Sequence, residues 1–300
     1  MSAEERFTAL AQQKMVTVGA GPSSDRGLIK SVREVFAHRE MLSLLVRRDL
    51  KSRYKDSALG FVWSLIRPLT QLFIYYVVIG KFLGAERGIP EFAIYVYTGL
   101  TAYGLLGEII GSSTSSIVGN SGLIKKIYLP REVFPLASTG SALFNFGIQL
   151  TILLLATLAL GSFPLTPDLI YLIPAFLVLL VYGMAVGFLL AAVNVYLRDT
   201  QYLVEVLLML ALWASPVVYS WSMVKGILGD GIALAIYTNN PITLGVLGFQ
   251  RALWTAGGAT AEYPDNLMLS LGVAFAIGVA LLAVFHRVFV KLQGNFAQAL

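Results

Sequence analysis

Apolar residues are grouped along this chain in six long runs that contain few charges. Each run is long enough for a helix to cross a hydrocarbon core of ~30 Å, which takes about 20 apolar residues. Charged residues are concentrated between the runs. The pattern therefore predicts six transmembrane helices, at residues 59–83, 92–110, 134–160, 169–196, 202–219 and 267–289.

Composition supports this interpretation and excludes an ordinary soluble domain. The 300 residues are 57% hydrophobic and only 13% charged, and the mean hydropathy is +0.74. Soluble domains carry about 25% charged residues. The chain has no cysteine, which excludes disulfides and thiolate metal sites. We predict an all-α integral membrane protein.

The N-terminal part is basic and differs from the rest. Residues 1–30 contain the Gly-Ala-Gly-Pro-Ser-Ser run at 19–24 and predict a mobile tail, whereas 31–56 predict an amphipathic helix on the membrane surface. Residues 1–60 contain half of the 22 Lys and Arg, and such clusters stay in the cytoplasm. With six spans in the domain 57–300, both termini are expected in the cytoplasm. The alternative is that this basic helix is only a topology signal.

Two further segments carry special patterns. Glycine, proline and asparagine divide residues 222–265 into short apolar pieces. We expect 231–237 and 242–254 to be re-entrant helices that enter the outer leaflet and return, which requires protein or a cavity around them. Residues 111–122 are rich in Ser, Thr and Gly, which favours close helix packing or a frayed helix end.

Three of the charged side chains inside the predicted spans are candidate functional or pairing residues. An intramembrane Arg is a functional or pairing residue unless it reaches the cytoplasmic surface, and both readings stay open. Two carboxylates on different spans, both expected to be buried, could relay protons or bond neighbouring helices. These intramembrane residues are Arg67, Glu108 and Glu205.

Tyr and Trp are frequent in three of the spans. Their rings pack against the C–H faces of sugars while their polar edges form hydrogen bonds. The alternative is the aromatic belt found at both membrane surfaces, which fits least for Tyr75 and Tyr103 because they lie deeper. The candidate channel residues are Tyr75, Tyr76, Tyr103, Trp213, Tyr219 and Trp221.

Several kinds of chemistry are missing from the sequence. It contains no Gly-x-x-x-x-Gly-Lys-Ser/Thr motif, so we expect no nucleotide site in this chain. It also has no Cys/His spacing for a metal. We therefore predict no cofactor, no catalytic residue and no nucleic-acid partner.

Four stretches carry a family resemblance. They are VRRDLKSRYKDSALGFVWSLIRPL at 46–69, NSGLIKKIYLPREVFPL at 120–136, NVYLRDTQYLVE at 194–205, and the outer segment from Asn240–Pro241 through Phe249–Gln250–Arg251. Together they resemble the permease subunits of the ABC-2 family of polysaccharide exporters, which move O-antigen, teichoic acid or cell-wall galactan. The resemblance covers nearly the whole chain from residue 31.

The resemblance implies a complex in the bacterial inner membrane. Two copies of this chain would pair with two copies of a separate ATPase subunit, which binds ATP and Mg, and would export a lipid-linked polysaccharide. The first, second and fifth spans would line the channel. The N-terminal helix and the piece 120–136, which contains the short amphipathic segment 123–135, would be the interface and coupling helices that contact the ATPase. The expected ATPase-coupling residues, including two in the turn before the fifth span, are Arg47, Arg48, Leu123, Lys125, Lys126, Arg131, Arg198 and Asp199.

The outer re-entrant segment would form an external gate that includes Asn240, Pro241 and Arg251. Two other functions remain as alternatives. One is an ABC-2 exporter of a drug or a small lipid, with the same architecture and a narrower path. The other is a membrane-embedded glycosyl- or acyltransferase, which would need an acid/base or metal cluster near a membrane surface.

Overall fold

The computed structural model describes residues 39–54, 62–84, 86, 88–126 and 129–300. Over these residues the chain is helical and contains no strand. The predicted tail 1–30 lies outside the described residues. Of the predicted surface helix 31–56, the described part is helix α3 (Arg39–Tyr54).

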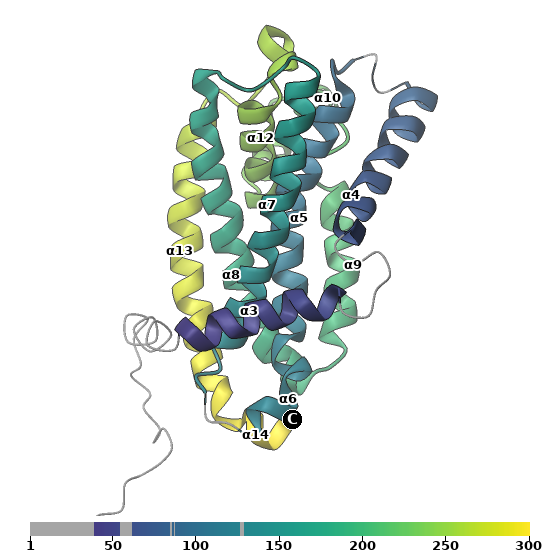
Figure 1. The fold of residues 1–300 in the computed structure, drawn as a ribbon. Coiled ribbons are helices and arrows are strands. Elements are labelled where there is room, and N and C mark those ends of the chain that lie inside the picture. Colours follow the sequence, from purple (N-terminus) through teal and green to yellow (C-terminus); the bar gives the residue numbers. More distant parts are fainter. Residues whose placement is uncertain (1–38, 55–61, 85, 87, 127–128) are drawn as a thin grey trace, which may run out of the picture.

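Four long helices run side by side and form the body of the molecule (Figure 1). They are α5 (Phe92–Gly119), α7 (Val133–Ala159), α8 (Leu172–Tyr196) and α13 (Leu267–Leu292). Among the described residues, each of these is long and apolar enough to cross a membrane. Helix α5 is the most buried of the four because α7, α8, α9 and α12 all pack against it.

The first and fifth predicted spans take a different form. The first is α4 (Trp63–Ile74) followed directly by the π-helix η2 (Tyr75–Phe82), with Pro68 removing one backbone hydrogen bond inside α4. The fifth is α9 (Thr200–Trp213), which has only 14 residues. The count of six spans therefore stays a prediction, because among the described residues four to five meet the criteria for a span.

Short helices gather at the upper end of the bundle in Figure 1. They are α10 (Trp221–Leu228), α11 (Ile232–Thr238) and α12 (Pro241–Leu253), with the 3-10 turns η4 (Pro167–Tyr171) and η5 (Thr255–Thr260). Helices α11 and α12 match the two expected helices, and they are bent by 69° relative to each other. That these two helices enter the outer leaflet and return stays a prediction, because the same bent pair could also form one broken span. Helix α10 was not expected.

The opposite end holds α3, which lies across the bundle, and the C-terminus (Figure 1). A second core joins Leu45 of α3 to Phe134, Phe188 and Phe289 of the long helices and to Phe296. Phe296 begins α14 (Phe296–Ala299), after the turn η6 (Gln293–Asn295). The predicted amphipathic segment 123–135 is shorter than expected: α6 (Ser121–Ile124) has four residues, and residues 127–128 lie outside the described part.

Candidate functional site

Helix α5 presents one polar face that the rest of the chain covers only in part. Between Ile94 and Ile117 of this fully described helix, the residues that are not buried recur at helical spacing and are all small or polar. The buried faces of α5 carry most of its large apolar side chains together with buried Thr and Ser, so the less buried face is the one without aliphatic side chains. The residues of this face, called the α5 face below, are Tyr103, Gly104, Gly107, Glu108, Gly111, Ser112 and Ser115.

Helix α7 adds polar groups beside the α5 face. The Asn145 side-chain amide donates a hydrogen bond to Glu108 Oε1. Gln149 lies one turn further along α7, and its Oε1 would be 3.5 Å from a Cβ built at Gly104. Asn145 and Gln149 share a side of α7 because they are four residues apart. Polar groups from two helices therefore meet halfway along the bundle.

The two predicted intramembrane carboxylates have different surroundings. Glu108 is half-buried and bonded to Asn145, whereas Glu205 is exposed on α9. The expectation that Glu205 is buried is therefore wrong for this chain: on α9 only Thr200 and Val204 are buried. The Arg67 side chain lies outside the described part, so its pairing stays a prediction.

Four of the candidate channel aromatics belong to α9 or contact it. The rings of Tyr75 and Trp213 meet edge to face, with centroids 6.3 Å apart. The Tyr219 hydroxyl donates to the Trp213 carbonyl oxygen at 2.8 Å. The Tyr103 hydroxyl donates to the carbonyl oxygen of Leu208, which ties α5 to α9. These contacts join Tyr75, Trp213 and Tyr219 in one aromatic surface at the end of α9, and the Tyr103 hydroxyl ties α9 to the α5 face.

The remaining two aromatics do not extend this surface. Trp221 is only 7% exposed, and its indole N–H donates to Thr238 Oγ1 at 2.8 Å. It belongs to the core, which conflicts with its predicted place in a channel. Tyr76 is half-buried, and the Lys81 ammonium lies 5.3 Å from its ring centroid.

The predicted gate residues have structural partners. The Asn240 side chain accepts a hydrogen bond from the Ile242 N–H at 3.0 Å and caps α12, and Pro241 occupies the first turn, as is common at helix starts. Arg251 Nε lies 3.2 Å from Asp168 Oδ1, and its guanidinium lies over the Tyr171 ring at 4.2 Å. These contacts fix both ends of α12.

Tyr263 completes the surroundings of Arg251, with its ring centroid 5.6 Å from the guanidinium. Burial raises the pKa of the Tyr263 phenol, and the positive charge of Arg251 offsets this to a smaller extent. The phenol therefore stays neutral, and its ring face remains available to the cation. Arg251 thus holds α12 against η4 and the loop that contains Tyr263.

The predicted ATPase-coupling residues lie at the α3 end of the bundle. Leu123 is half-buried against the second core. Arg131 is also half-buried, and its guanidinium lies 5.7 Å from the Phe296 ring centroid. Arg48 is bonded to other side chains of this chain. The remaining coupling residues are exposed and therefore available to a partner: Arg47, Lys125, Lys126, Arg198 and Asp199.

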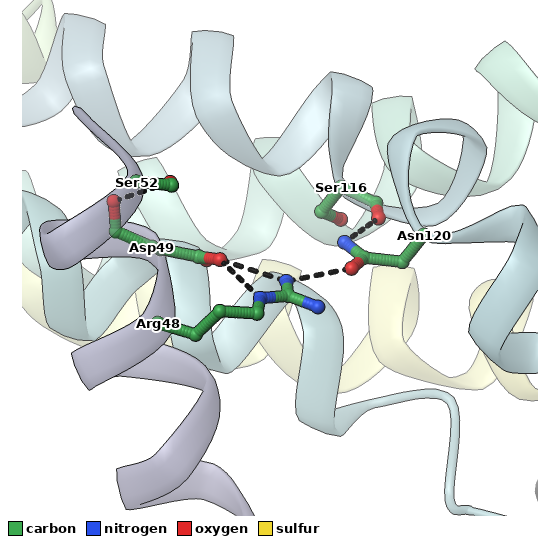
Figure 2. Close-up of polar contacts among 5 residues, drawn as sticks. All are labelled: Arg48, Asp49, Ser52, Ser116 and Asn120. Atoms are coloured by element: carbon green, nitrogen blue, oxygen red, sulfur yellow. Dashed lines mark hydrogen bonds and ion pairs between the residues drawn. The ribbon is translucent and has the colours of Figure 1, made fainter. Parts of the chain in front are cut away.

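Arg48 has a contact that the sequence did not indicate. Figure 2 shows its guanidinium between Asp49 and Asn120, with Nη2 donating to Asp49 Oδ1 and to Asn120 Oδ1, each at 2.7 Å. The Asn120 amide in turn donates to the Ser116 carbonyl oxygen at 2.7 Å. The chain of bonds connects α3 to the end of α5.

Sequence reasoning also missed Glu132, which is only 4% exposed and accepts a hydrogen bond from the Gln293 amide at 3.1 Å. Its position just before α7 suits a carboxylate, because a helix N-terminus attracts negative charge. The Asn-Ser-Gly run at 120–122 was the available signal for a helix junction at Asn120. No signal in the sequence indicated the distant partners of either residue.

Comparison with known proteins adds a family. Residues 40–254 match the family described as ABC-2 type transporter. The chain is 28% identical over 273 residues to the O-antigen export system permease protein RfbA of Myxococcus xanthus, which covers 91% of this chain and 100% of that protein. It is 27% identical over 266 residues to a protein of the same name from Klebsiella pneumoniae, covering 87% and 95%.

The chain is also similar to the capsule polysaccharide export inner-membrane protein CtrC of Neisseria meningitidis serogroup B. That similarity is 23% identity over 163 residues, or 52% of this chain and 58% of that protein. The family match begins within α3 and continues to the end of α12, so it includes the α5 face and the Arg48 contact. This chain belongs to the ABC-2 type transporter family.

Proposed function

We propose that this chain is the membrane permease subunit of an ATP-driven exporter that moves a lipid-linked polysaccharide from the cytoplasm across the inner membrane. Family membership supports a transporter subunit. The relatives that align over nearly their whole length are named as O-antigen export permeases, which supports a polysaccharide cargo of the O-antigen, teichoic-acid or galactan type.

The observation that carries the proposal is the α5 face. A polymer that slides through a membrane needs many weak contacts, because a few strong ones would hold it in place. Glycine and serine offer space and small hydrogen-bonding groups, and each aromatic ring adds about 0.5–1.5 kcal/mol of stacking. The α5 face and the surface formed by Tyr75, Tyr103 and Trp213 combine these properties along one side of the bundle.

The proposal includes an assembly. Two copies of this chain would form a homodimer that encloses the channel, and two copies of an ATPase subunit would bind ATP and Mg beneath it. This chain would hold no cofactor. The ATPase would dock at the α3 end, where Arg47, Lys125, Lys126, Arg198 and Asp199 are exposed, so this end and both termini would lie in the cytoplasm.

The test is reconstitution of the chain and its ATPase in lipid vesicles with a lipid-linked polysaccharide. Export should require ATP and both subunits, and the chain alone should hydrolyse no ATP. Ser112→Trp places a large side chain on the α5 face and should block export while the complex still assembles. The matched control is Val279→Trp on the exposed side of α13, which should export normally.

Three results would contradict the proposal. ATP-dependent transport of a small lipid or drug, with no transport of polysaccharide, would favour the alternative exporter. Normal polysaccharide export by the Ser112→Trp variant would show that the channel lies elsewhere. Transfer of a sugar or acyl group by the purified chain would favour the transferase alternative.

A further inference from the structure

Asn120 lies where two helices of the chain join. It follows the last residue of α5 and precedes the first residue of α6. Its carbonyl oxygen accepts hydrogen bonds from the Leu123 and Ile124 N–H groups, both at 3.0 Å, while its side-chain amide donates to the Ser116 carbonyl oxygen at 2.7 Å. Asn120 therefore sets the direction in which α6 leaves α5.

Arg48 brings a third helix to this junction. Its Nη2 donates to Asn120 Oδ1 at 2.7 Å, and Asp49 holds the same guanidinium through Nε at 3.1 Å and Nη2 at 2.7 Å (Figure 2). Asp49 accepts from the guanidinium on one side, so the fork of N–H groups is turned toward Asn120. The Nε and Nη2 donors of Arg48 are thus engaged inside the chain.

The rest of α3 lies against α7. A Cβ built at Gly140 would be only 2.9 Å from Val46 Cγ2, so glycine is what allows this close approach, and Leu45 is buried in the second core. Helix α3 is therefore seated on α7 by apolar contacts, and Arg48 extends from it to α5 and α6. One short polar bridge connects the surface helix to the helix that carries the α5 face.

We infer that the Arg48–Asn120 hydrogen bond is a mechanical joint that makes α3, α6 and the inner end of α5 move together. The inference rests on the proposed function, in which an ATPase docks on α3 and on the segment that includes α6. Displacement of either surface by the ATPase then reaches the α5 face through Asn120. Arg48 is a positioning residue in this scheme and not a docking contact.

The exposure of the bridge supports a positioning role over a folding role. The Arg48 and Asp49 side chains are 47% and 28% exposed, and ion pairs and hydrogen bonds at such sites add little to folding stability. Loss of the bridge should therefore leave the chain folded and the ATPase bound. What should be lost is the transmission of nucleotide binding to α5.

The experiment reports on α5 directly and needs no cargo. The chain has no native cysteine, so Ser112→Cys places one thiol on the α5 face of the complex with its ATPase. We expect ATP to change the maleimide-labelling rate of this thiol. In Arg48→Ala and Asn120→Ala the response to ATP should shrink about fivefold or more, the range typical of linked sites, while the ATPase still copurifies.

Three comparisons make the test specific. The control is Arg39→Ala, which removes an exposed Arg from the same helix and should leave the response intact. The double variant Arg48→Ala/Asn120→Ala should be no worse than Asn120→Ala alone, because that variant already removes the contact with Arg48. Asn120→Asp keeps the acceptor oxygen and should retain the response.

A cross-link provides the converse measurement. The Arg48→Cys/Asn120→Cys variant replaces the hydrogen bond with two thiols, and a fluorescent residue at position 112 then reports on α5 instead of maleimide labelling. Without a cross-linker this variant should not respond to ATP. A short bismaleimide that joins the two thiols should restore the response. An unchanged response in Arg48→Ala and Asn120→Ala, or loss of the ATPase from those complexes, would overturn the inference. Failure of polysaccharide export by the parent complex would contradict the proposed cargo only, since this reporter does not depend on it.

Discussion

The hydroxyl of Tyr103 shows how one side chain on the α5 face serves two purposes. Its ring is half-exposed on that face, while its hydroxyl donates to the Leu208 carbonyl oxygen of α9. Leu208 lies inside a regular helix, so its carbonyl gains a second donor from Tyr103. The ring face and the hydroxyl of Tyr103 therefore have separate roles: the ring lies on the α5 face, and the hydroxyl anchors α9.

This dual role predicts different outcomes for two Tyr→Phe substitutions. Tyr103→Phe keeps the ring face but removes the bond to Leu208, and interhelical hydrogen bonds of this kind contribute about 0.6 kcal/mol on average in membranes. We expect a small loss of stability in a detergent unfolding titration and near-normal export. Tyr75→Phe is the matched comparison, since the structure gives Tyr75 a ring contact with Trp213. A stability loss in Tyr75→Phe equal to that in Tyr103→Phe would contradict this assignment.

Residue types at the site could be predicted from the sequence, but their partners could not. The basic residues of α3 were evident from charge, and Tyr103 from its depth in an apolar run. The bond between Arg48 and Asn120 joins residues 72 positions apart, and that between Tyr103 and Leu208 joins residues 105 apart. Such pairs depend on how helices pack, which the pattern of a single sequence does not specify.

Helix boundaries show where local rules fall short. The second span was expected to end at residue 110, yet α5 continues to Gly119. The reason is that Ser and Thr side chains in this run donate hydrogen bonds to backbone carbonyl oxygens of α5. Thr114, for example, donates to the Ile110 carbonyl oxygen at 2.8 Å. These hydroxyls therefore have partners without water, and the helix can continue. The fifth span was expected to reach residue 219, yet α9 ends at Trp213, before the break that Pro216 imposes.

Close packing of α12 against α8 gives a prediction for this element. A Cβ built at Gly248 would be 2.6 Å from the Ala175 Cβ, and a methyl group cannot rotate away. Gly248→Ala should therefore push α12 off α8 and cost about 1–3 kcal/mol, as overpacking does. A shift of the midpoint in an unfolding titration measures this cost.

The control for Gly248→Ala is Gly272→Ala in α13. A Cβ at Gly272 would meet nothing within 4 Å, and alanine favours a helix by about 1 kcal/mol over glycine. This variant should be as stable as the parent chain or more so. Equal losses in both variants would mean that α12 does not pack on α8 as described.

At the scale of the whole molecule, the arrangement of the ends supports a topology experiment. Helices α3 and α14 lie at one end of the bundle, and α10 lies toward the other (Figure 1). Asp230→Cys, just after α10, should react with an impermeant maleimide in intact cells, because the Asp230 side chain is 85% exposed. Gln298→Cys in α14 should react only after the membrane is permeabilised. The reverse pattern would invert the proposed orientation.

The exposed side of α9 predicts where two copies of the chain meet. Only two of its 14 residues are buried within the chain, and at 1.5 Å per residue it is about 21 Å long, shorter than a ~30 Å hydrocarbon core. Its exposed apolar side chains surround Glu205, and a carboxylate facing lipid costs several kcal/mol unless it reaches water or a partner. The exposed side of α13 is apolar at Leu269, Val273 and Ile277 and suits lipid directly.

We therefore expect a second copy to cover α9 and lipid to cover α13. Leu203→Cys or Leu207→Cys on α9 should form covalent dimers with a bismaleimide in native membranes, because a two-fold axis brings the same residues together. Val273→Cys on α13 is equally exposed and should give none. Cross-linked dimers through Val273, with none through either α9 position, would place the subunit contact on α13. Water at the cytoplasmic surface would then have to solvate the Glu205 carboxylate.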